Sequence, residues 1–129
     1  MDNYVRDLPK ITNHPYWINQ VKKLSILDYW GNFLTPGDFQ SNHIHNNSWL
    51  SGVYYLDEPK NEKDNNNAGW IEFNRSGYNL PRFGGEKEIQ LIRLEIGMFI
   101  MFPSYVWHGT IPYTTSYTRG NISFDINIK

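Results

Sequence analysis

The feature that most constrains this chain is a series of short runs rich in β-branched and aromatic residues. Turn formers such as Thr35-Pro36-Gly37-Asp38 and Asn46-Asn47-Ser48 separate these runs. Short strands at such spacing, with little helix between them, predict an all-β domain built as a sandwich or jelly roll. About eight runs are expected to be strands: Leu24–Phe33, Phe39–His45, Leu50–Leu56, Gly69–Phe73, Glu88–Leu94, Met98–Phe102, Val106–Ile111 and Asn121–Ile128.

Three local patterns refine this picture. The stretch from Ile11 to about Leu24 predicts one short helix, because Pro15 stands near its first turn. Residues 58–68 lack an apolar side chain before Ala68 and predict an exposed, mobile loop. Regular alternation in the last run predicts a strand with one face toward the core. The alternating apolar residues are Ile122, Phe124, Ile126 and Ile128.

Length and composition narrow the classes of protein that the chain can belong to. A chain of 129 residues predicts a single domain with a packed core. The net charge of −1 argues against nucleic acid or an anionic membrane surface as partner. The absence of cysteine excludes disulfides, thiolate metal sites and a cysteine nucleophile. Because neither a secretory signal nor a long apolar run is visible, we expect a soluble cytoplasmic protein.

Three of the four histidines stand in a pattern that metals favour. His43 and His45 are two residues apart, and in a strand such residues point to the same face. His108 lies in another strand-like run that could fold back to supply a third ligand. Three neutral imidazoles with coordination positions left open would form a metal site suited to binding a substrate. The alternative is that these are surface or loop histidines, which is how we interpret His14.

Arg119 is the next candidate, because it opens the last strand-like run. A guanidinium group grips a carboxylate through two parallel hydrogen bonds. An arginine beside a metal with open positions would therefore suit a keto acid that chelates the metal at one end. The alternative is an ordinary solvated residue at a strand end.

Several segments, taken in order, carry a family resemblance. The most specific are the run Ser51-Gly52-Val53-Tyr54-Tyr55-Leu56 after the histidine pair and Phe102-Pro103-Ser104 before the distal histidine. Trp30-Gly31-Asn32, Asn42–His45 and Arg119–Asp125 also fit. Over roughly residues 28–128 the chain resembles the 2-oxoglutarate- and iron(II)-dependent oxygenase family common in phages and marine bacteria.

The resemblance implies a double-stranded β-helix, a cupin-like jelly roll whose open end holds Fe(II). His43 falls at the first ligand position of that superfamily and His108 at the distal one. Arg119 falls where an arginine grips the far carboxylate of 2-oxoglutarate, the implied cosubstrate. Asn121 stands where a serine often follows and could donate a hydrogen bond. Tyr54 and Tyr55 lie on the strand that commonly supplies further cosubstrate contacts, and either one could face inward.

His45 departs from the superfamily pattern, because the superfamily has a carboxylate at that position. The ligand and catalytic set implied here is therefore His43, His45 and His108. Three neutral imidazoles leave the +2 charge of the iron uncompensated until an anion such as 2-oxoglutarate binds. The implied reaction couples the oxidative decarboxylation of 2-oxoglutarate, which releases succinate and CO₂, to hydroxylation of a substrate.

Aromatic and basic residues near these positions are candidates for substrate contacts. Trp107 is adjacent to His108, and Arg75 and Arg82 lie in the loop Asn74–Gly85, where they could meet an anionic substrate. The ordinary alternatives are core or rim aromatics and solvated arginines. The candidate aromatic walls of the pocket are Trp49, Trp70, Tyr105 and Trp107.

Three functional classes stay open on the sequence. The first is an Fe(II)- and 2-oxoglutarate-dependent oxygenase acting on a small-molecule or peptide substrate. The second is a cupin-like enzyme that uses the three histidines without 2-oxoglutarate, and the third is a non-catalytic jelly-roll binding or structural module, such as a phage accessory protein. Few insertions are available to enclose a substrate, so a homodimer that completes the mouth of the site is also plausible.

Overall fold

All regular secondary structure in the described residues is β-strand. The computed structural model describes residues 24–57, 67–75, 89–114 and 116–128. Its strands are β1 (Leu24–Leu34), β2 (Leu50–Asp57), β3 (Ile71–Phe73), β4 (Gln90–Ile92), β5 (Phe99–Pro103), β6 (His108–Thr110) and β7 (Arg119–Ile128). The predicted all-β class is confirmed. The predicted helix falls on residues 11–23, and most of the predicted loop on residues 58–66, so both lie outside the described residues.

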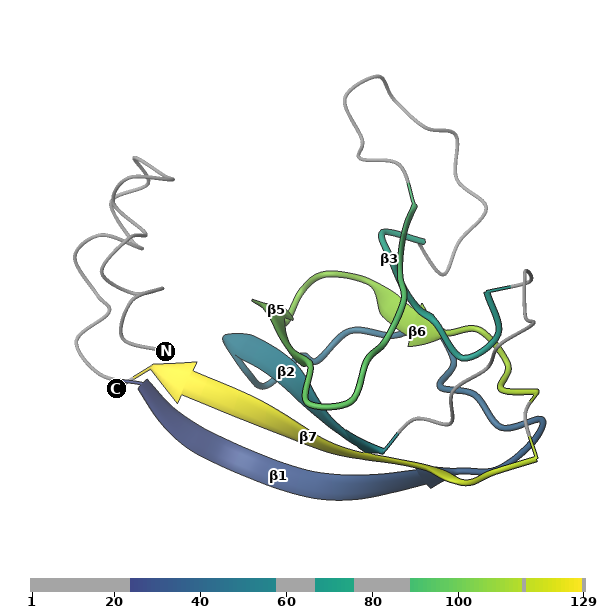
Figure 1. The fold of residues 1–129 in the computed structure, drawn as a ribbon. Helices are drawn as coiled ribbons and strands as arrows, with labels where there is room; N and C mark the ends of the chain where they lie inside the picture. The colour runs from purple at the N-terminus through teal and green to yellow at the C-terminus, as the bar shows by residue number, and fades with distance from the viewer. Residues whose placement is uncertain (1–23, 58–66, 76–88, 115, 129) are drawn as a thin grey trace.

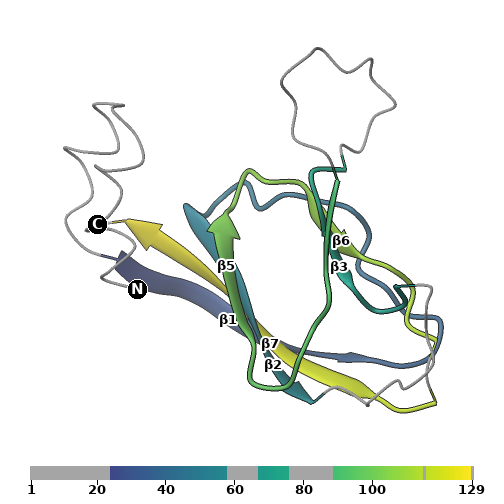
Figure 2. The same cartoon turned by 45° about the horizontal axis from the view of Figure 1, so that its top comes forward.

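The strands form two antiparallel sheets that face each other. The larger sheet has the strand order β1-β7-β2-β5, and the smaller one has the order β4-β3-β6. Figures 1 and 2 show the smaller sheet lying over the concave side of the long strands β1, β7 and β2. This is the jelly-roll arrangement that the sequence predicted. The space between the two layers is where residues from distant parts of the chain meet.

The predicted strand Phe39–His45 is the one run that does not form a regular strand. It lies beside β6 but pairs with it through a single bridge between His43 and His108. Gln40 instead donates its backbone N–H to the side-chain hydroxyl of Thr110 at 2.7 Å, which interrupts the backbone ladder. The prediction was wrong in detail, because a side-chain acceptor replaces the carbonyl that a strand would use.

The two faces of β7 have different chemistry. Arg119, Asn121, Ser123 and Asp125 alternate with apolar residues, so these four side chains share one face. Across the sheet, Ser51 pairs with Asp125, Val53 with Ser123 and Tyr55 with Asn121. Val53 and Tyr55 pack into the apolar cluster that also holds Ile71 and Phe73 of the smaller sheet. The polar face of β7 therefore points toward the smaller sheet, and we call it the inner face.

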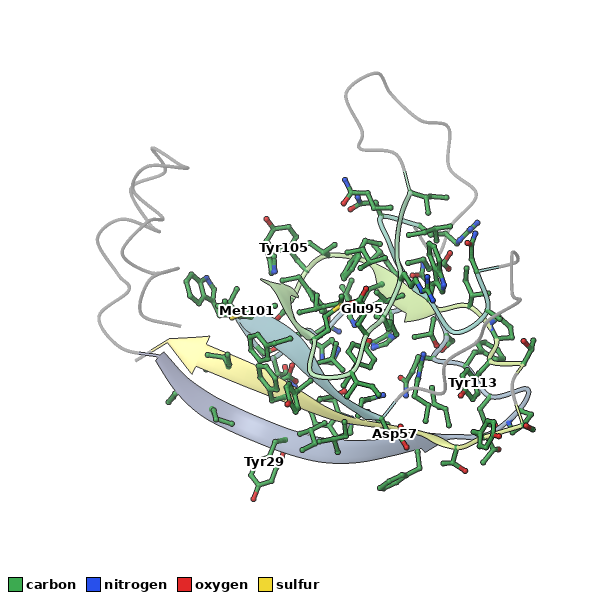
Figure 3. The ribbon with its side chains drawn as sticks, viewed as in Figure 1. Tyr29, Asp57, Glu95, Met101, Tyr105 and Tyr113 are labelled. Carbon is green, nitrogen blue, oxygen red and sulfur yellow. The ribbon has the colours of Figure 1, made fainter. Side chains whose placement is uncertain are left out.

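The apolar face of β7 forms a second cluster on the outer side of the larger sheet. Phe124 and Ile126 are buried there with Leu50, and Trp49 and Met101 pack against them. Tyr29 of β1, which pairs with Phe124, projects from this outer side in Figure 3. The alternation predicted burial of this face correctly for Phe124 and Ile126, but the space between the two sheets lies on the other face.

Candidate metal centre

Backbone hydrogen bonds bring the three histidines together from separate parts of the chain. His43 and His108 exchange both backbone hydrogen bonds, at 2.9 and 3.0 Å. The backbone N–H of His45 donates to the carbonyl of Ser104 at 3.0 Å, in the turn between β5 and β6. The histidine pair is therefore fixed on both sides, by β6 and by the turn that precedes it.

Gly109 permits this close approach. A Cβ atom at this position would lie 2.9 Å from the carbonyl oxygen of Gln40 and 3.1 Å from the Cα of Asn42. Both neighbours are backbone atoms, which cannot move aside as a flexible side chain can. Glycine directly after His108 is therefore required for the segment carrying His43 and His45 to lie against β6.

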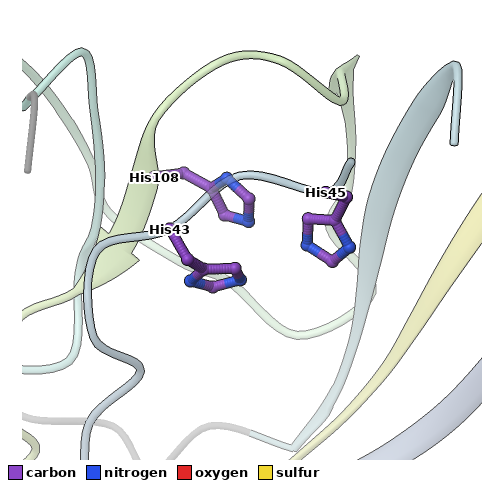
Figure 4. Close-up of side chains that lie close together, drawn as sticks. All are labelled: His43, His45 and His108. Carbon is purple, nitrogen blue, oxygen red and sulfur yellow. The ribbon is translucent and has the colours of Figure 1, made fainter. Parts of the chain in front are cut away.

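The three imidazole rings face one another across a small space, as Figure 4 shows. Their ring centroids are 4.3 Å apart for His43 and His108, 5.1 Å for His43 and His45, and 5.2 Å for His45 and His108. One ring nitrogen from each histidine lies within 4.8 Å of the other two. The sequence prediction that these side chains converge on one point is thus met in the described structure.

All three imidazole rings form their hydrogen bonds through Nδ1, which leaves Nε2 of each ring to bind a metal. Nδ1 of His43 lies 2.6 Å from the carbonyl oxygen of Ser41, and Nδ1 of His108 lies 2.9 Å from that of Val106. Nδ1 of His45 lies 3.1 Å from the carboxylate of Asp125. Carbonyl and carboxylate oxygens accept, so each Nδ1 carries the proton and donates. With Nδ1 as the donor, Nε2 is the nitrogen of each ring that can bind a metal.

His108 is held in the neutral form by its surroundings. Its side chain packs against Phe102, with ring centroids 4.4 Å apart, and the residue is only 7% exposed. Burial lowers the pKa of His108 from the usual 6.5 to about 4, although its bond to the Val106 carbonyl opposes that shift. At neutral pH this histidine can therefore offer a lone pair without first losing a proton.

Arg119 is buried at the start of β7, with 1% of its surface exposed. Its guanidinium carbon lies 5.7 Å from the ring centroid of Tyr55 and 5.4 Å from that of Tyr113. Nη1 donates to the carbonyl of Gly69, whose φ of +75° is left-handed. A Cβ at Gly69 would lie 2.8 Å from the Tyr113 ring, so this turn allows Tyr113 and Arg119 to pack closely.

One pocket contains both the histidines and the arginine. Its lining includes His43, His45, His108 and Arg119, as well as Tyr55 and Asn121, all singled out in the sequence. Asn121 is 6% exposed, and its side-chain oxygen accepts a hydrogen bond from Asn32 at 2.9 Å. The amide nitrogen of Asn121 is then the group that it can donate to a ligand.

Trp30 and Asn32 of β1 also line the pocket, although neither was predicted from the sequence to do so. The Trp30 ring stacks on His45 with centroids 6.0 Å apart. In the sheet, Trp30 pairs with Ser123 and Asn32 with Asn121, which places both on the inner face. The alternation of the two strands was visible in the sequence, but their register was not.

Several other candidates lie elsewhere. Tyr54 points to the outer face and is 38% exposed, because only alternate residues of β2 point inward, and these include Tyr55. Trp49 packs on the outer cluster, and Tyr105 lies at the periphery in Figure 3.

Arg75 is exposed and pairs with Glu72 at 2.9 Å. Arg82 lies outside the described residues. Within the described part of the chain, the pocket lining does not include Trp49, Tyr54, Trp70, Arg75, Tyr105 or Trp107.

Residues 28–125 match the model of a family described as "Putative 2OG-Fe(II) oxygenase". The chain belongs to this family. The resemblance noted in the sequence is therefore confirmed, and the family is one of 2-oxoglutarate- and Fe(II)-dependent oxygenases. The association with phages and marine bacteria stays a prediction.

Solved structures of similar fold include a hydroxylase and a 2OG-Fe(II) oxygenase family protein. A prolyl-4-hydroxylase from Pseudomonas putida matches with a TM-score of 0.60 and 15% identity, over 99% of this chain and 66% of its own. A 2OG-Fe(II) oxygenase family protein from Burkholderia pseudomallei matches with a TM-score of 0.63 and 11% identity, over 95% of this chain and 49% of its own. The chain thus spans about half to two thirds of the length of these structures.

A third similar structure contains bound ligands. HygX from Streptomyces hygroscopicus, solved with nickel and 2-oxoglutarate, matches with a TM-score of 0.58 and 12% identity, over 99% of this chain and 66% of its own. At such identities the likeness establishes the jelly-roll fold. A search of curated proteins found no match. The described residues contain no helix that is long and apolar enough to cross a bilayer.

Proposed function

We propose that this oxygenase binds Fe(II) through His43, His45 and His108 and hydroxylates a small-molecule or peptide substrate while converting 2-oxoglutarate to succinate and CO₂. The observation that supports it best is the shared pocket, which holds the three histidines and the buried guanidinium of Arg119. A metal site and a carboxylate site within one pocket suit a ligand that carries a keto acid at one end and a second carboxylate at the other.

The donor set fits the metal that the family uses. Each of the three rings donates from Nδ1 to an oxygen acceptor, so that three Nε2 lone pairs are available. Imidazole is a good ligand for iron, and three of them leave further coordination positions for a chelating cosubstrate. When bound, iron would supply the activation of dioxygen, while the chain supplies binding, orientation and exclusion of water.

Arg119 would bind the distal carboxylate of 2-oxoglutarate. Its position between the rings of Tyr55 and Tyr113 restricts the side chain, so less rotamer entropy is lost when the anion binds. Asn121, on the same inner face two residues away, would donate its amide N–H to the same ligand. Burial excludes water and so strengthens the attraction between the guanidinium and the carboxylate.

The substrate would enter beside Trp30 and Gln40, which line the pocket together with the histidines. An aromatic ring and a side-chain amide suit a small molecule or a peptide, and the net charge of −1 argues against nucleic acid or membrane lipid. The exposed aromatic residues Tyr29 and Phe99 on the outer face support a homodimer. Analytical ultracentrifugation would test that assembly.

The test of the proposed function is anaerobic titration of the protein with iron(II) and 2-oxoglutarate, observed by visible absorption. A metal-to-ligand charge-transfer band should appear only when both are present. His108→Ala should abolish the band and iron binding together, because it removes one of three ligands. If wild-type protein binds iron and shows no band at saturating 2-oxoglutarate, the 2-oxoglutarate part of the proposal is wrong.

The second candidate is a three-histidine metalloenzyme that does not use 2-oxoglutarate. The observation that favours it is the ligand set itself, because the described metal-binding group contains three histidines and no carboxylate. Succinate release during turnover separates the two. An iron-dependent oxidation that consumes no 2-oxoglutarate and is unaffected by Arg119→Ala would support this second candidate.

A further inference from the structure

Asp125 lies directly behind His45, and the sequence analysis gave it no role. It is on the inner face of β7, and its carboxylate oxygens are both 3.1 Å from Nδ1 of His45. Both side chains are only 16% exposed. The bond joins two residues 80 positions apart in the chain, so it depends on the packing of β7 beneath the histidine segment.

A chain of three serine hydroxyls holds the same carboxylate from the other side. Ser51 donates to Oδ1 of Asp125 at 2.7 Å. Because the Ser51 proton is used there, the 2.9 Å contact between Ser104 and Ser51 has Ser104 as its donor. Ser48 in turn donates to Ser104 at 2.8 Å. The hydroxyl protons of all three serines therefore point toward Asp125. This arrangement suits an ionised carboxylate.

This network lies next to the one position where the chain departs from the expected ligand pattern. His45 stands where the wider superfamily has a carboxylate, so the ligand set itself brings no negative charge to the metal. The structure places a carboxylate one imidazole ring further out. Ser104 connects the two sides of the arrangement, because its carbonyl accepts from the backbone of His45 while its hydroxyl belongs to the serine chain.

We infer that Asp125 is a positioning residue of the metal site, which acts through Nδ1 of His45 and supplies there the negative charge that the ligand set lacks. This inference rests on the proposed function, since it takes His45 to be a ligand. A carboxylate that accepts from a ligating histidine fixes the ring orientation and keeps the proton on Nδ1. It also makes the opposite nitrogen a stronger donor to the metal.

The effect of Asp125 is measured as metal affinity, which does not depend on turnover. Co(II) is titrated into metal-free protein in competition with a chelating dye, and the Co(II) absorption band reports the ligand set. Asp125→Asn keeps the shape and the hydrogen-bonding capacity but removes the charge, and it should weaken Co(II) binding about tenfold. Asp125→Ala also removes the acceptor and should weaken binding by up to about 100-fold.

Asp28 offers a matched control. It pairs with Asp125 across the sheet, but its carboxylate accepts from the backbone N–H of Tyr29 at 2.8 Å and is exposed. Asp28→Asn removes the same charge from the neighbouring strand and should leave Co(II) affinity unchanged. Ser51→Ala provides a milder variant that leaves both metal ligand and carboxylate in place. It should weaken Co(II) binding measurably, but by less than the roughly tenfold loss expected when the direct partner of a ligating histidine is changed.

A double-mutant cycle tests whether Asp125 acts through His45. His45→Asp places a carboxylate at the ligand position and removes the ring that Asp125 holds. In that background Asp125→Asn should cost at most about twofold in Co(II) affinity, compared with about tenfold in the wild type. Equal losses in both backgrounds would show that Asp125 acts independently of the ring, and would overturn the inference.

The outcomes separate the inference from the proposed function. If the wild type fails to bind Co(II) or Fe(II), the proposed function is wrong. If the wild type binds the metal and folded Asp125→Asn binds it equally well, only the role of Asp125 is wrong. If Asp125→Asn does not fold, Ser51→Ala decides, and an unchanged affinity in that variant would overturn the inference.

Discussion

The two faces of β7 come from alternate residues of one ten-residue strand, and both are largely buried. The outer face packs Phe124 and Ile126 into an apolar cluster. The inner face carries Arg119, Asn121 and Asp125, in or beside the pocket that holds the three histidines. Burial on the outer face needs only shape and apolar surface, whereas each polar group on the inner face needs a partner.

The comparison shows why the polar residues of a buried strand indicate function here. An apolar residue at an inner position would have packed as well as Val53 or Tyr55 does on the neighbouring strand. The chain instead places a buried arginine, an amide and a carboxylate there, each held by specific hydrogen bonds or ring contacts. Changes to the inner face should therefore alter ligand binding, and changes to the outer face should alter stability.

The largest expected effect is on the inner face, from Arg119→Ala. Loss of a charge-assisted, buried contact should weaken 2-oxoglutarate binding about 100-fold, since such contacts are worth up to about 3 kcal/mol. Co(II) affinity should stay unchanged, because the three histidines, and not Arg119, would hold the metal. Isothermal titration of 2-oxoglutarate into the metal-loaded protein measures the first affinity, and titration of Co(II) into the metal-free protein measures the second. Arg93→Ala, at an exposed position on the chain, provides the control.

The second effect is on the outer face, from Ile126→Ala. Ile126 is fully buried against Leu50, so the truncation leaves a cavity and should lower the free energy of unfolding by about 3 kcal/mol. Denaturant unfolding of metal-free protein measures the loss, and Ile122→Ala, which is half-buried, should cost clearly less. A tenfold change in the Co(II) affinity of folded Ile126→Ala would contradict the expectation that the outer face affects stability and not ligand binding.

The smallest expected effect is a pH dependence of the free energy of unfolding, caused by His108. Because burial lowers the pKa of His108 to about 4 in the folded protein, the unfolded chain takes up this proton first as pH falls below 6.5. Metal-free protein should therefore lose about 2 kcal/mol of stability between pH 7 and pH 5 from this group alone. Comparing wild type with His108→Gln by denaturant unfolding isolates that contribution. Parallel pH curves for the two proteins would contradict it.

Much of the fold followed from local patterns. Strand-like runs separated by turn formers predicted seven of the strands correctly, because each run needs only its own residues to favour extended structure. The segment of His43 and His45 was harder, because its irregular path depends on the Thr110 hydroxyl and on the absence of a side chain at Gly109. Those contacts come from residues far along the chain.

The site residues that could be predicted are those whose residue type alone indicates their chemistry. The residues that were missed are those whose position depends on the register of the paired strands. The convergence of the three histidines and the proximity of Arg119 followed from residue type and family pattern. Trp30, Asn32 and Asp125 were missed because their roles depend on the pairing of β7 with β1 and β2. The choice between Tyr54 and Tyr55 depended on the same register, since adjacent residues of a strand point to opposite faces.

The central claim is that three imidazoles hold the iron in the pocket formed on the inner face. X-ray absorption spectroscopy of the Fe(II)- and 2-oxoglutarate-loaded protein counts those ligands directly through the multiple scattering of histidine rings. We expect three imidazoles at about 2.1 Å in the wild type and two in His45→Asp, in which a carboxylate takes the place of one ring. A count of two in the wild type, unchanged in His45→Asp, would show that His45 is not a ligand and would contradict the three-histidine site.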